Sequence, residues 1–138
     1  MLQGAAVDRY GTIWRYRMRG RDLSPPAIEQ AGATFRAAAA LRGKFAHAER
    51  AGSVAIPALQ QHVALIAAAA SGKLTTRDTG VRDAGSSTCH AYVADVAHAR
   101  YRDVELGSDG AVADTQRVND APAAATLLAW LRSIGVAQ

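Results

Sequence analysis

The stretch Tyr10–Arg21 constrains the fold most, because its side chains alternate in character along the chain. The even positions hold Thr12, Trp14, Tyr16 and Met18, whereas the odd positions hold Ile13, Arg15, Arg17 and Arg19. Successive side chains of a β-strand point to opposite faces of its sheet, so this period of two predicts a strand with one aromatic face and one basic face. We expect the aromatic face to be buried and the arginine face to meet water or a partner.

Two helices are expected in the first half of the chain. Ser24-Pro25-Pro26 predicts the start of a helix that runs to about Arg42, because serine caps an orphan backbone N–H and proline fits the first helical position. Its apolar stripe is Ile28, Ala31, Phe35, Ala38 and Ala39. A second helix is expected over 57–70, ended by Ser71-Gly72.

A closing helix is expected from Pro122, with Asn119 or Asp120 as its cap and Gly135 as its end. Its apolar stripe is Leu127, Leu128, Leu131 and Ile134. Before it, residues 90–106 are expected to form a β-hairpin. The intervening Asp95–Ala99 contains no glycine, so one long bent strand is the alternative. A further strand is expected over 111–118.

The expected elements follow the order strand, helix, helix, strands, helix. This order lacks the regular alternation of strands and helices that βαβ units show. The pattern predicts an α+β fold in which about three helices pack on one face of an antiparallel sheet of three to four strands. With 138 residues the chain matches the size of one domain, and we expect a single domain over 1–138.

Residues 51–72 are free of Asp, Glu, Lys and Arg, and this length approaches that of a membrane span. Pro57 and several polar residues interrupt the stretch, so a buried helix of a soluble protein is the favoured interpretation. The first ten residues include Asp8 and Arg9 and lack the apolar run of a signal peptide. We therefore expect a cytoplasmic protein, or a secreted one if a leader has been removed.

Lys73–Thr88 shows no apolar periodicity, and such a length without an element is unusual in a compact domain. Loops of this kind are usually functional or disordered. We expect a long flexible loop over 73–88 that contacts a partner protein through Arg77, Asp78, Val81 and Arg82. The alternative is a connection without a binding role.

The net charge of +4 is unevenly distributed. Residues 1–50 hold nine Lys and Arg against four Asp and Glu, whereas residues 51–138 hold seven against eight. A basic face favours acidic partners, so the alternative function is binding to a nucleic acid or another acidic surface through Arg15, Arg17, Arg19 and Arg21. The arginines and the aromatic residues point to opposite faces of the expected strand, which disfavours a nucleic-acid binding surface that needs both on one face. The other interpretation of the arginine face is a solvated surface without a partner.

The sequence contains no recognisable catalytic or metal-binding pattern. Its one cysteine, Cys89, adjoins His90, but neighbours on a strand point to opposite faces and cannot share a proton. The four histidines are His47, His62, His90 and His98, and no pair has the i, i+4 spacing of helical metal ligands. We expect a non-enzymatic protein without a metal or cofactor.

Three stretches together carry a family resemblance: GTIWRYRMRGRDLSPPAIEQ, HAYVADVAHARYRDVELG and APAAATLLAWLRSI. They have the pattern of a leading strand before a helix, a pair of strands, and a closing helix. In these stretches, which cover about 50 of the 138 residues, the chain resembles emfourin, a small bacterial protein inhibitor of thermolysin-like (protealysin-type) zinc metalloproteases. The resemblance implies a non-enzymatic protein whose exposed loop enters or blocks the cleft of such a protease.

Overall fold

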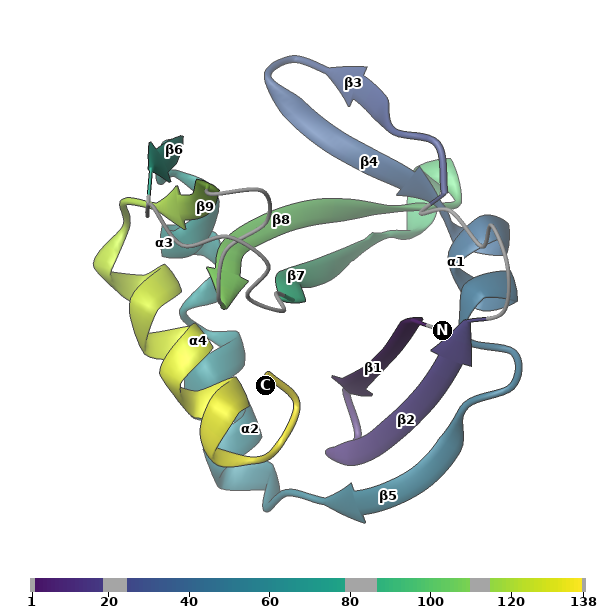
Figure 1. Cartoon of the computed structure of the whole chain (residues 1–138). Coiled ribbons are helices and arrows are strands. Elements are labelled where there is room, and N and C mark those ends of the chain that lie inside the picture. The colour runs from purple at the N-terminus through teal and green to yellow at the C-terminus, as the bar shows by residue number, and fades with distance from the viewer. Residues whose placement is uncertain (1, 19–24, 79–86, 110–114, 138) are drawn as a thin grey trace. The chain divides into compact units, whose positions relative to one another are not determined.

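The structure, a computed structural model, describes residues 2–18, 25–78, 87–109 and 115–137 (Figure 1). Within these ranges the chain forms nine β-strands and four short α-helices, which gives it α+β character. The expected single sheet of three to four strands is wrong, because the strands form one sheet of three and one of six. The difference arises because residues 2–7 and 49–53 form strands that the sequence did not predict, and because parts of the expected helix 24–42 and of the expected loop 73–88 also pair as strands.

Backbone contacts divide the chain into two compact units. Unit 1 comprises Met1–Val54 and Tyr92–Asp103, and unit 2 comprises Ala55–Ala91 and Val104–Gln138. Strands β7 (Ser87–Asp95) and β8 (Arg100–Asp109) contribute residues to both. Charge follows the same division: unit 1 holds eleven Lys and Arg against six Asp and Glu, a net +5, whereas unit 2 holds five against six, a net −1.

The three-stranded sheet of unit 1 has the order β1-β2-β5, and both pairs are antiparallel. Its strands are β1 (Leu2–Val7), β2 (Thr12–Met18) and β5 (Glu49–Ser53). The strand expected from the alternation at 10–21 is confirmed as β2. Trp14 and Tyr16 are half-buried, while Arg15 and Arg17 are exposed. The aromatic face is therefore only partly covered.

The helix expected over 24–42 is wrong for most of its length. Strands β3 (Ile28–Gln30) and β4 (Ala33–Ala37) pair in antiparallel register, and only α1 (Ala38–Lys44) is helical. Ala31 and Gly32 between the strands have φ of 51° and 75°. Positive φ at both central residues is the mark of the tight hairpin turn that suits the strand twist. Ser24, the expected cap, lies outside the described residues.

The hairpin expected over 90–106 is confirmed, because β7 pairs with β8. The short 3₁₀ helix η1 (Val96–His98) and Ala99 connect the two strands. Ala99 has φ of 50° and ψ of 44°, so it takes the left-handed conformation that glycine usually supplies. A turn without glycine is thus built at the cost of one unfavourable alanine.

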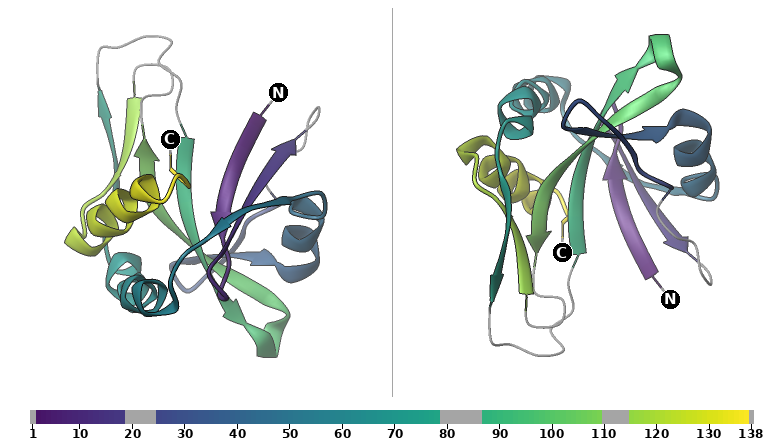
Figure 2. Two further views of the ribbon diagram at one scale, coloured as in Figure 1. Left: turned by 90° about the horizontal axis from the view of Figure 1, so that it is seen from below. Right: turned by 90° about the horizontal axis from the view of Figure 1, so that it is seen from above.

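Unit 2 contains the remaining helices, α2 (Ile56–Val63), α3 (Ile66–Ala70) and α4 (Pro122–Ser133). The helix expected over 57–70 is correctly placed but is broken at Ala64-Leu65, and Ala51 of the charge-free stretch belongs to β5. Helix α4 lies beside α2 and α3 in both views of Figure 2. None of the helices formed by the described residues is long and apolar enough to cross a membrane.

The closing helix α4 begins at Pro122 and ends before Gly135, so both expected ends are confirmed. Leu127 and Leu131 of α4 are buried, and Gly135 follows the helix with φ of 77°. The Val136 N–H donates to the Leu131 carbonyl at 2.8 Å and the Gly135 N–H to the Arg132 carbonyl at 3.1 Å, which together form a Schellman motif. The expected cap is wrong: the N-cap is Ala121, and no side chain caps the helix.

Strands β6 (Leu74–Asp78) and β9 (Thr115–Asn119) pair in antiparallel register in unit 2. The loop expected over 73–88 is wrong for Leu74–Asp78, which form β6, and for Ser87 and Thr88, which begin β7. Residues 79–86 lie outside the described residues. Of the strand expected over 111–118, residues 115–118 are confirmed as part of β9, which continues to Asn119, and residues 111–114 lie outside the described residues.

Candidate functional site

Strand β6 is the last strand in the order β8-β9-β6. All five of its residues are exposed, and Leu74 keeps 40% of its surface accessible. On one edge it pairs with β9 over its whole length, from Leu74 opposite Asn119 to Asp78 opposite Thr115. Among the described residues no second strand pairs with it. An edge of this kind offers backbone N–H and C=O groups to another chain.

The base of β6 is held by polar contacts of the residues that end β9. Asp120 Oδ1 accepts the Lys73 N–H at 2.7 Å, and the Asp120 N–H donates to the Lys73 carbonyl at 3.0 Å. The neighbouring Asn119 is 8% exposed, and its Nδ2 donates to the carbonyls of Ala69 at 2.9 Å and Glu105 at 3.0 Å. The strand is thus anchored where it begins.

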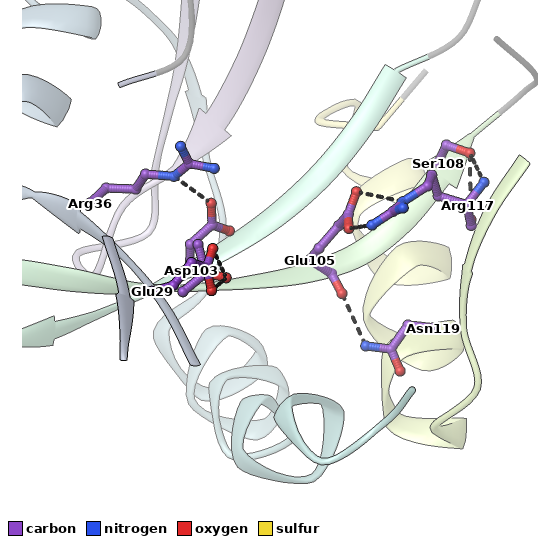
Figure 3. Close-up of polar contacts among 8 residues, drawn as sticks. Glu29, Arg36, Asp103, Glu105, Ser108, Arg117 and Asn119 are labelled. Carbon is purple, nitrogen blue, oxygen red and sulfur yellow. Dashed lines mark hydrogen bonds and ion pairs between the residues drawn. The ribbon is translucent and has the colours of Figure 1, made fainter. Parts of the chain in front are cut away.

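Strand β9, the partner of β6, is itself tied to β8 (Figure 3). Arg117 donates from Nη2 to Glu105 Oε2 at 2.6 Å and from Nε to Glu105 Oε1 at 3.3 Å. The hydrogen bonds to the Glu105 carboxylate, and its charge, raise the pKa of Arg117. Ser108 Oγ accepts the Arg117 N–H at 2.9 Å. These links make β9 a fixed template for β6.

Two of the four expected partner-contact residues lie on β6. Arg77 is exposed and donates from Nη2 to Gln116 Oε1 at 2.6 Å, while the adjacent Asp78 is exposed on the opposite face. Val81 and Arg82 lie outside the described residues. The sequence did contain a signal for the strand, because the β-branched pair Thr75-Thr76 is typical of strands.

The basic face expected on β2 is interrupted. Arg15 and Arg17 are exposed, but Arg15 lies directly opposite Glu49 of β5. The negative charge of Glu49 reduces the positive electrostatic potential of the arginine face. Arg50 lies opposite Trp14, which places a cation on the aromatic face. Arg19 and Arg21 lie outside the described residues.

Unit 1 also contains a polar cluster around Asp103 of β8. Its carboxylate, with 3% of the side chain exposed, accepts the Nε–H of Arg36 at 3.0 Å (Figure 3). Burial, and then the Asp103 charge, raise the pKa of Tyr92, and burial lowers the pKa of Lys44. A phenol with a raised pKa stays protonated at neutral pH, and an arginine stays charged. The arrangement is that of a buried ionic link between β4 and β8.

Cys89 and His90 share β7, whereas His62 lies on α2 and His98 on η1. Cys89 is buried and His90 follows it on β7, so their side chains point to opposite faces. His62 Nδ1 lies 2.7 Å from the Ala58 carbonyl, and its ring stacks on Trp130 with a centroid distance of 4.3 Å. In the described ranges no three His, Cys, Asp or Glu side chains gather in a group that could hold a metal ion.

Comparison of the chain with protein-family models, with curated proteins and with solved structures gave no match.

Proposed function

We propose that the protein is a non-enzymatic module that binds another protein, and that it does so by adding an extended segment of the partner to the outer edge of β6. The exposure of all five residues of β6 carries this proposal. Strand addition takes its affinity from backbone hydrogen bonds and its specificity from alternate side chains. Here the alternate side chains are Leu74, Thr76 and Asp78 on one face and Thr75 and Arg77 on the other.

The contacts beneath β6 support this function energetically. A binding edge that is already ordered loses little conformational entropy when the partner arrives. The bonds of Asn119 and Asp120 at the start of the strand, together with the pairing to β9, supply that order.

The partner we propose to test first is a thermolysin-like metalloprotease, because the chain resembles emfourin in three stretches. Peptide hydrolysis by such a protease should decrease when the purified protein is present at micromolar concentration. Unchanged hydrolysis would remove the inhibitor version of the proposal.

The wider proposal is tested without a known partner by selecting from a library of displayed random peptides. Selected peptides should compete with one another for β6 and should bind more weakly when Arg77 is changed to Ala. Failure to enrich any peptide, or equal binding by the Arg77→Ala variant and the wild type, would count against β6 as the binding edge.

A second candidate function is binding to an acidic surface. The net charge of +5 on unit 1, with Arg15 and Arg17 exposed, favours it. Each phosphate that is neutralised releases counterions, so affinity for DNA or RNA should fall steeply with salt. Absence of any DNA or RNA shift at low ionic strength would exclude this candidate.

A further inference from the structure

One cation of β6 lies without a carboxylate beside it. Arg77 is exposed, and its Nη2 donates to Gln116 Oε1 on β9 at 2.6 Å. Among the described residues this is its one polar contact, and it forms no ion pair. A guanidinium presents five N–H donors in a planar fork that fits both oxygens of a carboxylate. In a partner, this position therefore favours a carboxylate.

Two neighbouring cations differ from Arg77, because each has a carboxylate beside it. Lys73, just before β6, has its backbone N–H bonded to Asp120 Oδ1 at 2.7 Å. Arg117 of β9 pairs with Glu105 through Nη2 at 2.6 Å. Unit 2, which contains all of these residues, has a net charge of −1. The preference for an acidic group thus arises at the single position of Arg77 and not from a summed charge.

The backbone of β6 places Arg77 where the side chain of a partner comes closest. The Asp120 N–H donates to the Lys73 carbonyl at 3.0 Å, so Lys73 directs its backbone groups towards β9. Backbone groups of successive strand residues point to alternate edges, so those of Arg77, four residues later, also point towards β9. At the outer edge Arg77 then forms a pair without backbone hydrogen bonds, in which opposite Cα atoms lie about 4.5 Å apart instead of about 5.5 Å. A carboxylate opposite Arg77 reaches the guanidinium directly.

Leu74 adds an apolar position on the other face of the strand. It is 40% exposed and lies three residues before Arg77, so the two side chains point to opposite faces. An apolar residue opposite Leu74 covers this surface, and β-branched residues opposite Thr75 and Thr76 suit a pleated strand pair. Antiparallel pairing is slightly more stable per residue than parallel pairing, and β6 already pairs with β9 in this way.

We propose, resting on the strand addition proposed for β6, that its partner is an extended protein segment with an acidic residue opposite Arg77 and an apolar residue opposite Leu74. In antiparallel pairing this segment reads, from its N-terminus, acidic residue, two β-branched residues, apolar residue. A nucleic acid offers a phosphate to Arg77, but it has neither the strand backbone for the edge nor an apolar side chain for Leu74.

The test measures binding of synthetic peptides to the whole chain. The peptide core Glu-Thr-Thr-Val, between neutral Ser-Gly flanks, should bind about threefold or more tightly than Lys-Thr-Thr-Val, because opposite charges across a strand pair attract and like charges repel. Added salt should reduce this difference. Val-Thr-Thr-Glu has the same composition in reverse order and should bind more weakly than Glu-Thr-Thr-Val. Equal or tighter binding of the reversed core would overturn the antiparallel order.

Two charge reversals locate the effect on the protein. Arg77→Glu should prefer the lysine peptide over the glutamate peptide, whereas Arg132→Glu, at an exposed position of α4, should keep the preference of the wild type. Both positions are exposed, and an unchanged Tm checks that both variants fold. The same preference in Arg77→Glu as in the wild type would overturn the assignment of the acidic residue to this position.

Hydrogen exchange separates this inference from the function on which it rests. If the glutamate and lysine peptides bind equally and both slow the exchange of amides within residues 74–78, the acidic pattern is wrong and strand addition stands. If peptides bind without slowing these amides, or if neither these peptides nor a random library gives any binding, strand addition at β6 is itself overturned. Displacement of the glutamate peptide by single-stranded DNA that binds the wild type and not Arg77→Glu would replace the acidic peptide with a nucleic acid.

Discussion

Asn119 donates a hydrogen bond from Nδ2 to the backbone carbonyl of Ala69 at 2.9 Å, which joins the end of β9 to the end of α3. The same nitrogen reaches the Glu105 carbonyl on β8 at 3.0 Å, and the side chain is buried. One amide thus connects three elements of unit 2 at the base of β6. The binding edge that we propose depends on this connection for its rigidity.

The first prediction concerns this amide. Asn119→Ala removes both hydrogen bonds donated by Nδ2 and takes from the Ala121 N–H the Oδ1 acceptor that lies 3.0 Å away, so it should lower the free energy of unfolding by about 2–3 kcal/mol. Urea denaturation measures the change. Gln60→Ala, on the exposed face of α2, is the control and should change stability by less than about 0.5 kcal/mol. Equal effects of the two substitutions would show that Asn119 is not a structural link.

The second prediction compares two glycines. A Cβ at Gly72 would lie 1.9 Å from Asn119 Oδ1 and 2.9 Å from the Ala121 nitrogen, whereas a Cβ at Gly43 would have nothing within 4 Å. Gly72→Ala should therefore destabilise by more than about 1 kcal/mol. Gly43→Ala, inside α1, should stabilise by about 0.5–1 kcal/mol, because alanine is the better helix former. Thermal denaturation of both variants should give shifts of Tm in opposite directions.

The third prediction concerns pH and the tip of the β7–β8 hairpin. Hydrogen bonds from Arg100 and His98 hold the pKa of Asp95 below its usual value of 3.8. The folded state therefore prefers the carboxylate, which stabilises the protein above the usual pKa, and this contribution is lost as pH falls through the lowered pKa. Asp95→Asn should have a lower Tm than the wild type at pH 7, and the difference should disappear towards pH 2. A difference that stays constant over this range would argue against the charge as its cause.

The fourth prediction uses proline to probe the free edge of β6. Consecutive backbone N–H groups of a strand point to opposite edges, so one of Thr75 and Thr76 directs its N–H towards β9 and the other directs it outwards. Of Thr75→Pro and Thr76→Pro, one should lose more than about 1 kcal/mol of stability through the lost pairing with β9. The other should keep its stability and lose binding of a selected peptide tenfold or more. Matched valine variants, which retain the N–H, should bind as the wild type does.

Local sequence patterns predicted an element correctly where they agreed with the strand pairing and helix packing of the folded protein. The alternation at Thr12–Met18 identified β2, and the proline start and glycine end identified α4. The helix expected over 24–42 failed because the alanine-rich pattern favours a helix, while Ala31-Gly32 turns the chain back on itself. The Thr34 hydroxyl then donates to the Glu29 carboxylate across the strand pair at 3.0 Å, a contact that only the hairpin creates.

The candidate sites were less predictable than the elements. Arg77 and Asp78 were predicted as contact residues because residues 73–88 lack apolar periodicity, which suggested a loop. In the structure they are exposed on a strand, β6. The contacts that anchor β6 and the tip of the β7–β8 hairpin join residues far apart in the chain, such as Asn119 with Ala69 and Arg100 with Gln30. Such long-range hydrogen bonds depend on the complete fold and cannot be predicted from the spacing of residues in a single sequence.

Hydrogen exchange of the backbone amides, with and without a bound partner, tests the proposed use of β6 most directly. When a selected peptide or an inhibited protease is bound, the outward-facing amides within residues 74–78 should exchange at least tenfold more slowly. Binding that leaves the exchange of these amides unchanged, while slowing it elsewhere in the chain, would contradict strand addition at this edge.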